Sequence, residues 1–147
     1  MAITKSGFYG LTLEKMLIDT SARDLEAETN KLMLIQDAET PDFTLDDFRD
    51  DVSSEVTGTN YSAGGVAYTG TDLTLSGDVM TYDASVDTVF SNVTISSAMA
   101  GVGYADVGTA GTDQLFFLSD FVTAASATAA DFTVQWHANG ILTITYA

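Results

Sequence analysis

The alternation of apolar and polar side chains is clearest over residues 131–147, on both sides of a loop at 138–140. A period of two is typical of strands with one buried face. A two-residue Asn-Gly loop would set the two apolar rows on opposite faces, whereas a three-residue loop with a left-handed Gly140 sets them on one face. We therefore predict a hairpin that buries Trp136 and exposes His137. Its pairs are Trp136 with Leu142, Val134 with Ile144, and Phe132 with Tyr146.

From residue 31 onward, short apolar runs are separated by turns rich in Gly, Thr and Ser. Lys31–Gln36 has the length and composition of a central strand. The alanine-rich residues 124–130 predict a loop. Short strands with frequent turns indicate a mainly β fold, an antiparallel β-sandwich or barrel-like sandwich over residues 31–147. Further strands are predicted at 66–69, on both sides of Gly77 within 72–82, as a pair within 86–95, at 99–105 and at 114–121.

The N-terminal segment, residues 1–30, has the least regular pattern. Residues 8–18 predict a short helix with Leu13, Met16 and Leu17 on its buried side. The polar residues that follow predict turns. We expect the segment to form an arm or helix that packs on the β core or, alternatively, on a neighbouring subunit.

Acidic side chains gather in residues 37–55, where eight carboxylates accompany Arg49. Thr44 predicts the N-cap of a second short helix over residues 45–52. Because Ca²⁺ is bound by clustered carboxylate oxygens, this segment is a candidate Ca²⁺ site, although its spacing differs from the EF-hand pattern. The alternative is a solvent-exposed acidic helix. The candidate ligands are Asp42, Asp46, Asp47, Asp50 and Asp51.

The net charge of the chain is −16, and all five basic residues lie within the first 49 positions. An acidic surface repels phosphate backbones, so nucleic acid is not an expected partner. No apolar run reaches the length of a membrane span, and residues 1–10 lack the apolar run of a secretory signal. We therefore expect no membrane partner and synthesis in a cytoplasm. The absence of cysteine excludes disulfides and thiolate metal sites.

Candidates for catalysis are few. His137, the only histidine, is expected to face solvent, and no phosphate-binding or nucleophile motif is present. We therefore expect no enzyme and no cofactor, with a carboxylate-based hydrolase as the alternative, because carboxylate separation depends on the folded structure. Tyrosines are favoured in contact patches, since they bury area and keep a polar tip. The candidate contact residues are Tyr61, Tyr68 and Tyr104, and the alternative is that they lie at the edge of the core.

Residues 31–70 contain, in order, an apolar strand, a polar loop, an acidic segment and the motif E-V-x-G-x-x-Y-x-A-G-G at 55–65. This order resembles a family of small virion-associated β-domain proteins of tailed bacteriophages. Residues 132–145, with Q-W-H-A-N-G-I-L-T-I, resemble the final hairpin of the same family. One departure is Phe116–Phe121, where an apolar strand is followed by Val122 and the alanine-rich residues.

The resemblance implies a structural virion protein, made in the host cytoplasm and located in the virion. The expected role is that of a capsid decoration or cement protein that stabilises contacts between capsomers. Its implied partners are the major capsid protein, or another structural protein of the virion, and further copies of itself in a homo-oligomer. The alternative is a tail or fibre component that binds a host receptor or glycan.

Overall fold

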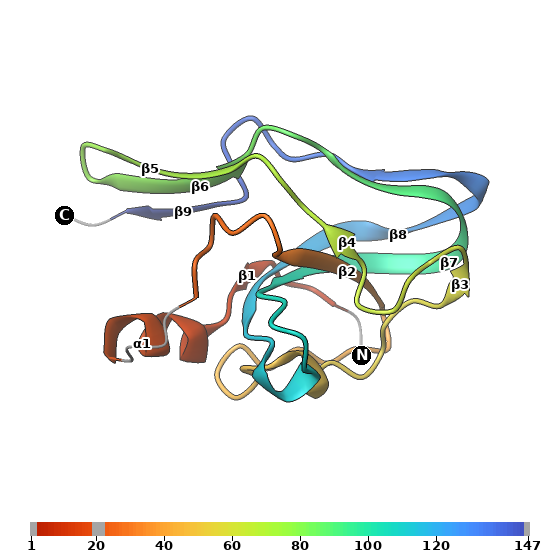
Figure 1. The fold of residues 1–147 in the computed structure, drawn as a ribbon, viewed down its shortest axis with the longest axis horizontal. Helices are drawn as coiled ribbons and strands as arrows, with labels where there is room; N and C mark the ends of the chain where they lie inside the picture. The colour runs from red at the N-terminus through yellow and green to blue at the C-terminus, as the bar shows by residue number, and fades with distance from the viewer. Residues whose placement is uncertain (1–2, 19–22, 146–147) are drawn as a thin grey trace.

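The computed structural model describes residues 3–18 and 23–145. Figure 1 shows two antiparallel sheets that pack against each other, with one helix near the N-terminus. The fold is mainly β, as the short alternating runs and glycine-rich turns predicted. The antiparallel β-sandwich expected from the sequence is therefore confirmed.

The larger sheet is built around two long strands, β7 (Thr88–Tyr104) and β8 (Leu115–Val134), which pair along most of their length. The strand order is β1-β8-β7-β2-β4, and β3 also pairs with β7. The shorter strands are β1 (Gly7–Phe8), β2 (Lys31–Gln36), β3 (Gly58–Thr59) and β4 (Val66–Ala67). Lys31–Gln36 is thus a strand between two others, as predicted.

The two long strands bend together (Figure 1). The start of β7, paired with the end of β8, lies over the part of the same two strands that pairs with β1 and β2. Their pairing shifts register at several points, and Ser97 and Val122 near the bend have positive φ angles of 57° and 66°. Bulges of this kind bend a strand and let it pass from one layer to another. The separate strands predicted at 86–95 and 99–105 are therefore one strand. The alanine-rich residues 124–130, predicted as a loop, belong to β8.

The smaller sheet has the order β5-β6-β9 and projects from the body of the molecule (Figure 1). Its strands are β5 (Thr71–Ser76), β6 (Val79–Ala84) and β9 (Leu142–Thr145). Gly77, in the turn between β5 and β6, has a φ of +59°. The predicted turn at this glycine is thus present.

The predicted C-terminal hairpin does not form. β8 pairs with β7 up to Val134, whereas β9 pairs with β6, so that Leu142 lies opposite Tyr82 rather than Trp136. The backbone N–H of Ile141 donates a hydrogen bond to the carbonyl oxygen of Tyr82 at 2.8 Å, which starts this pairing. A period of two defines the faces of a strand but not its neighbour, and the prediction failed for that reason. The proposed partner of Phe132, Tyr146, lies outside the described residues.

Other parts of the hairpin prediction hold. Trp136 is half-buried in the connection from β8 to β9, with its ring 6.0 Å from that of Phe117 and 6.2 Å from that of Tyr68, centroid to centroid. His137 is exposed, and Gly140 is left-handed with a φ of +93°. The tryptophan therefore belongs to the edge of the core.

Strand β2 is buried on both faces, and its four central residues, Leu32–Ile35, are at most 1% exposed. Leu32 and Leu34 join a cluster with Phe90, Phe117 and Phe132 between the two layers. Met33 and Ile35 join a second cluster on the opposite face, covered by the N-terminal segment and the acidic segment. The sheet is thus packed on both sides, as a continuous apolar run predicts.

Helix α1 (Gly10–Ile18) forms where predicted but presents a different face to the body. Its one buried residue is Thr12, whose hydroxyl donates a hydrogen bond to the carbonyl oxygen of Leu115. Lys15 forms an ion pair with Asp47. These two polar contacts orient the helix, so Leu13 and Leu17, predicted to be buried, are exposed, whereas Met16 packs at the edge of the core.

Gly65→Ala is expected to be strongly destabilising. The φ of Gly65 is +76°, and an added Cβ would lie 1.8 Å from the carbonyl oxygen of Leu32. Gly108→Ala is the matched control, because its φ is +96° but an added Cβ would meet no described residue beyond its chain neighbours within 4 Å. Urea unfolding should show a loss of about 1–2 kcal/mol for Gly108→Ala, from left-handed strain alone, and a loss above about 4 kcal/mol for Gly65→Ala. Equal losses would contradict the close approach of residue 65 to β2.

Candidate functional site

The acidic segment, residues 37–55, contains only a short 3₁₀ turn, η1 (Arg49–Asp51), instead of the predicted helix over 45–52. Its carboxylates accept hydrogen bonds from nearby backbone N–H groups: Asp42 from Thr44 at 2.9 Å, and Asp46 from Asp42 at 2.7 Å. Such local side-chain bonds compete with the hydrogen bonds of a helix. The segment is therefore an irregular cover for the sheet.

The five candidate Ca²⁺ ligands do not converge on one point. Asp42, Asp46 and Asp51 accept backbone hydrogen bonds, Asp47 pairs with Lys15, and Asp50 is exposed. Residues 3–18 and 23–145 contain no group of three or more His, Cys, Asp or Glu side chains that could hold a metal ion. In this arrangement Asp42, Asp46 and Asp51 serve as hydrogen-bond acceptors for backbone N–H groups.

Two glutamates hold loops together: Glu39, which was not among the candidate site residues, and Glu55, the first residue of the motif at 55–65. Glu39 is 6% exposed, and its Oε2 accepts hydrogen bonds from the backbone N–H groups of Ser53 at 2.8 Å and Ser54 at 2.7 Å. Glu55 Oε1 accepts hydrogen bonds from the hydroxyl of Tyr61 at 3.0 Å and from the N–H of Gly64 at 2.6 Å. The burial of Glu39 is therefore explained by its bonds to the backbone. The glutamate of the E-V-x-G-x-x-Y-x-A-G-G motif likewise has a structural role.

A buried ion pair lies at the base of the acidic segment. Asp113 is fully buried, and its Oδ2 lies 2.9 Å from Nε of Arg49, which donates a hydrogen bond to it. Oδ1 of Asp113 accepts a second bond from the N–H of Val107 at 2.8 Å. Burial lowers the pKa of Arg49, but the contacts with Asp113 and Tyr104 outweigh it, so the pKa lies above its usual value. In the sequence, the only indication of this ion pair was that Arg49 is the one arginine among eight acids in residues 37–55.

The three candidate contact tyrosines are not free surface residues. Tyr68 and Tyr104 are each 1% exposed, and Tyr61 is half-buried. The hydroxyl of Tyr104 donates to the carbonyl oxygen of Gly64 at 2.7 Å, and burial raises the pKa of all three. A hydroxyl with a partner inside the protein allows the ring to enter the core. Their burial agrees with the alternative, that these tyrosines belong to the core, and not with an exposed contact patch.

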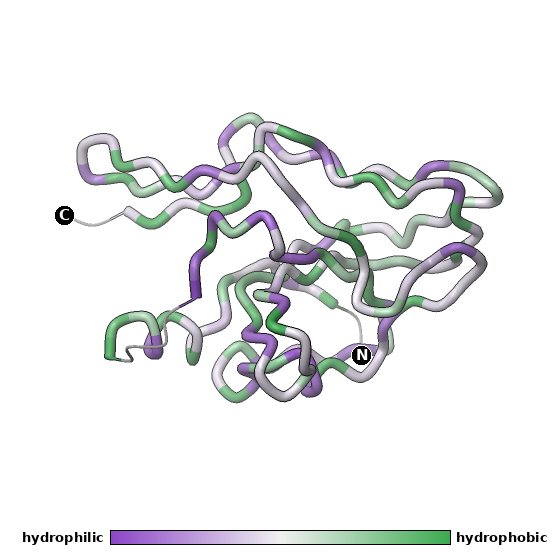
Figure 2. Tube along the Cα trace, in the orientation of Figure 1, coloured by the Kyte–Doolittle hydropathy of each residue, from purple (hydrophilic) through white to green (hydrophobic). Residues whose placement is uncertain are grey.

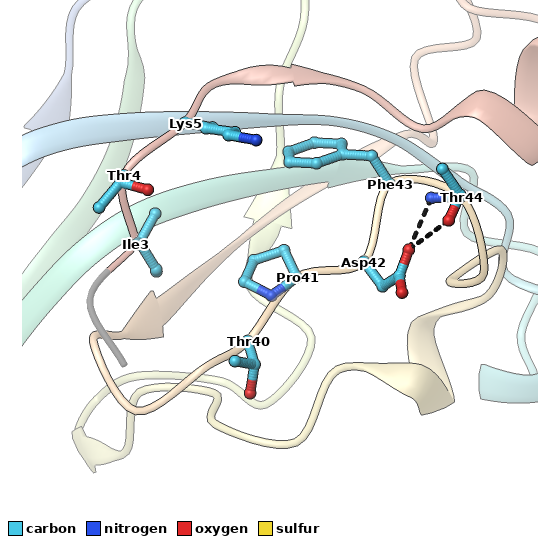
Figure 3. A pocket seen from close by; sticks show the side chains of 8 residues that line it. All are labelled: Ile3, Thr4, Lys5, Thr40, Pro41, Asp42, Phe43 and Thr44. Carbon is cyan, nitrogen blue, oxygen red and sulfur yellow. Dashed lines mark hydrogen bonds between the residues drawn. The ribbon is translucent and has the colours of Figure 1, made fainter.

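A hollow with a volume of about 430 Å³ lies between the N-terminal segment and the start of the acidic segment (Figure 3). Ile3–Lys5 line one side and Thr40–Thr44 the other, with the Lys5 side chain pointing toward the Phe43 ring. The carboxylate of Asp42 is already bonded to the N–H and hydroxyl of Thr44. The hollow holds no pair of facing acids.

Two neighbouring acids have pKa values shifted in opposite directions. The hydrogen bonds from Thr44 lower the pKa of Asp42, and burial raises that of Asp46, aided by the charge of Asp51. Opposite shifts are typical of acid–base pairs, but Asp46 does not line the hollow and binds the backbone of Asp42. The sole histidine, His137, is exposed and accepts a hydrogen bond from the N–H of Asn139.

Comparison with models of protein families, with curated proteins and with solved structures finds no match to this chain. Among the described residues, no helix has the length and apolar character needed to cross a membrane.

Arg49→Met should cost about 3–5 kcal/mol of unfolding free energy, because it leaves the fully buried Asp113 carboxylate without its countercharge. The control is Lys31→Met, which removes the partly exposed ion pair with Asp106 and should cost less than about 1 kcal/mol. Urea denaturation of both variants at neutral pH measures the difference. A loss as small for Arg49→Met as for Lys31→Met would show that the pair does not hold the segment.

Asp46→Asn should stabilise the protein at neutral pH by less than about 1 kcal/mol. A folded-state pKa raised by burial means that the stability from Asp46 is present at low pH and lost as pH rises through that pKa. The amide oxygen of Asn can still accept the hydrogen bond from Asp42. Asp42→Asn is the control of opposite sign, because its folded pKa is lowered and its contribution is lost as pH falls. Thermal unfolding of both variants from acidic to neutral pH measures how each change in stability depends on pH. The same direction of pH dependence in both variants would refute the opposite pKa shifts.

Proposed function

We propose that this chain is a structural virion protein of a tailed bacteriophage, and that it decorates the outside of the capsid. It stabilises contacts between capsomers by binding the major capsid protein or another structural protein of the virion. Several copies form a symmetric homo-oligomer set by the symmetry of the particle. The resemblance of residues 31–70 and 132–145 to virion-associated proteins supports this proposal.

The observation that carries the proposal is apolar surface left exposed on the part of the chain that holds α1 and the smaller sheet. Leu17 and Ile18 on α1 are 78% and 76% exposed, and Leu75 on β5 is 62% exposed. Figure 2 shows hydrophobic stretches along α1, and hydrophobic and polar stretches in turn on the smaller sheet. Leu17 and Ile18 are adjacent in the chain, and exposed apolar side chains that lie together are typical of a protein–protein contact.

Charge also supports a place on the outside of a particle. The net charge of −16 repels a packaged genome and keeps the free protein dispersed before assembly. The E-V-x-G-x-x-Y-x-A-G-G motif at 55–65 has a structural role. Glu55 accepts hydrogen bonds from Tyr61 and Gly64, and Gly65 lies against β2. A protein whose distinctive residues hold a loop in place fits a scaffold better than a catalyst.

The test is to locate the chain in purified particles by cryo-electron microscopy, supported by gold-labelled antibodies. We expect density at regular positions over the capsid, and capsids assembled without the chain should lose integrity at a lower temperature. The experiment needs no inactive variant as a control, because it measures where the chain lies and not an activity. Absence from purified particles would refute the proposal.

Labelling at the tail or its fibres would instead support the alternative, a component that binds a host receptor or glycan. The buried positions of Tyr68 and Tyr104 remove the aromatic groove that a glycan site would use. For this reason the capsid is the proposed location.

A further inference from the structure

The smaller sheet has one polar and one apolar face. Residues opposite each other in an antiparallel pair share a face, and Leu75 lies opposite Met80, which lies opposite Ile144. Farther in, Leu73 lies opposite Tyr82, and Tyr82 enters the core. The apolar face is therefore covered at its inner end and open at its outer end, where Leu75 and Ile144 are exposed.

Beside Leu73, this face borders α1 and residues 23–26. A hollow of about 350 Å³ is lined by Leu73 together with Met16, Leu25 and the charged residues Arg23, Asp24 and Glu26. An extended segment laid along β5 would place alternate side chains over Leu75 and into this hollow. The face thus has a shape suited to a strand, not to a flat partner.

The outer edge of β5 is open to a further strand. β5 is the last strand of the smaller sheet among the described residues, with β6 on its other side. The N–H of Leu73 points away from β6 and donates a hydrogen bond to Oε1 of Glu26 at 2.7 Å. A carbonyl of an added strand could take the place of this carboxylate, as happens in β-augmentation.

The polar face carries a charge conflict. Asp72 and Asp83 are directly opposite each other on β5 and β6. Like charges at opposed positions destabilise a strand pair, and neither aspartate forms an ion pair with a described Lys or Arg. A basic side chain from outside the chain would relieve this repulsion.

We propose that the edge of β5 and the apolar face beside it bind an extended segment of another virion protein, in which apolar and basic residues alternate. The apolar side chains pack beside Leu75, and the basic ones lie on the opposite face beside Asp72, whose neighbour across β5 and β6 is Asp83. A second copy of this chain is the wrong occupant, because β5 would meet a second acidic edge. The identity of the partner as a virion protein rests on the proposed function, but the chemistry of the segment does not.

The first experiment titrates the full-length, ¹⁵N-labelled chain with two synthetic peptides of about eight residues, one alternating Val with Lys and one alternating Val with Glu. The Val-Lys peptide should shift the amide resonances of Thr71–Ser76, and the Val-Glu peptide should not. Leu75→Thr, which keeps β propensity, should weaken Val-Lys binding at least about fivefold. Leu45→Thr is the control, because Leu45 is 71% exposed but lies in the acidic segment, and it should leave binding unchanged.

A charge variant separates simple attraction from strand pairing. Asp72→Asn should weaken Val-Lys binding several-fold while keeping the shifts on β5. Equal binding of both peptides, or shifts centred away from β5, would overturn the inference. So would sedimentation equilibrium in which the free chain forms a dimer that Leu75→Thr dissociates, because the face would then bind a second copy.

The second experiment adds the purified chain to particles assembled without it. Wild type and Leu45→Thr should rebind, and Leu75→Thr should rebind at least about fivefold more weakly. Failure of the wild-type chain to occur on native particles refutes the proposed function, while the peptide titration still decides the inference. Rebinding of Leu75→Thr at the wild-type level refutes the inference and leaves the proposed function standing.

Discussion

The burial of β2 on both faces is the constraint on which the rest of the structure depends. Four consecutive apolar residues, Leu32–Ile35, require a cover on each side of the sheet. On one side, the cover consists of the start of β7 and the end of β8, together with the inner end of the smaller sheet. On the other side the cover is the N-terminal segment and the acidic segment, including Phe43 and Val52. Each cover then determines a part of the surface.

The acidic cover explains why so many carboxylates lie near the core. An irregular loop over a sheet leaves backbone N–H groups that need acceptors, and a carboxylate is the strongest acceptor among the side chains. Glu39 accepts two such bonds from Ser53 and Ser54, and Asp113 combines a backbone bond with the ion pair to Arg49. These acids are part of the scaffold. Asp72 and Asp83, on β5 and β6, are not part of this scaffold.

The sequence predicted what depends on local pattern, and it missed what depends on distant partners. The buried strand at 31–36, the turns at Gly77 and Gly140 and the exposed His137 follow from neighbouring residues alone. The pairing of β9 with β6 does not, because its alternation fits either partner equally well. The alanine-rich residues 124–130 have low strand propensity, and only pairing with β7 makes them a strand. The burial of Tyr68 and Tyr104 depends on distant partners too, because their hydroxyls bond to Tyr82 and to the carbonyl oxygen of Gly64.

The same dependence on distant partners explains why the smaller sheet is left incomplete. Its inner end is fixed by Tyr82, whose hydroxyl donates to the carbonyl oxygen of Leu25 at 2.7 Å and whose ring packs near Phe117. Burial, partly offset by the hydrogen bond with Tyr68, raises the pKa of Tyr82 to about 12, so its hydroxyl stays protonated and can keep donating this bond at neutral pH. The anchor therefore holds β6 in place and leaves β5 at the rim with its outer edge unpaired by another described strand. An edge strand with exposed leucines on one face and opposed acids on the other is costly in a free protein. A partner segment with apolar and basic residues in alternation relieves both costs at once.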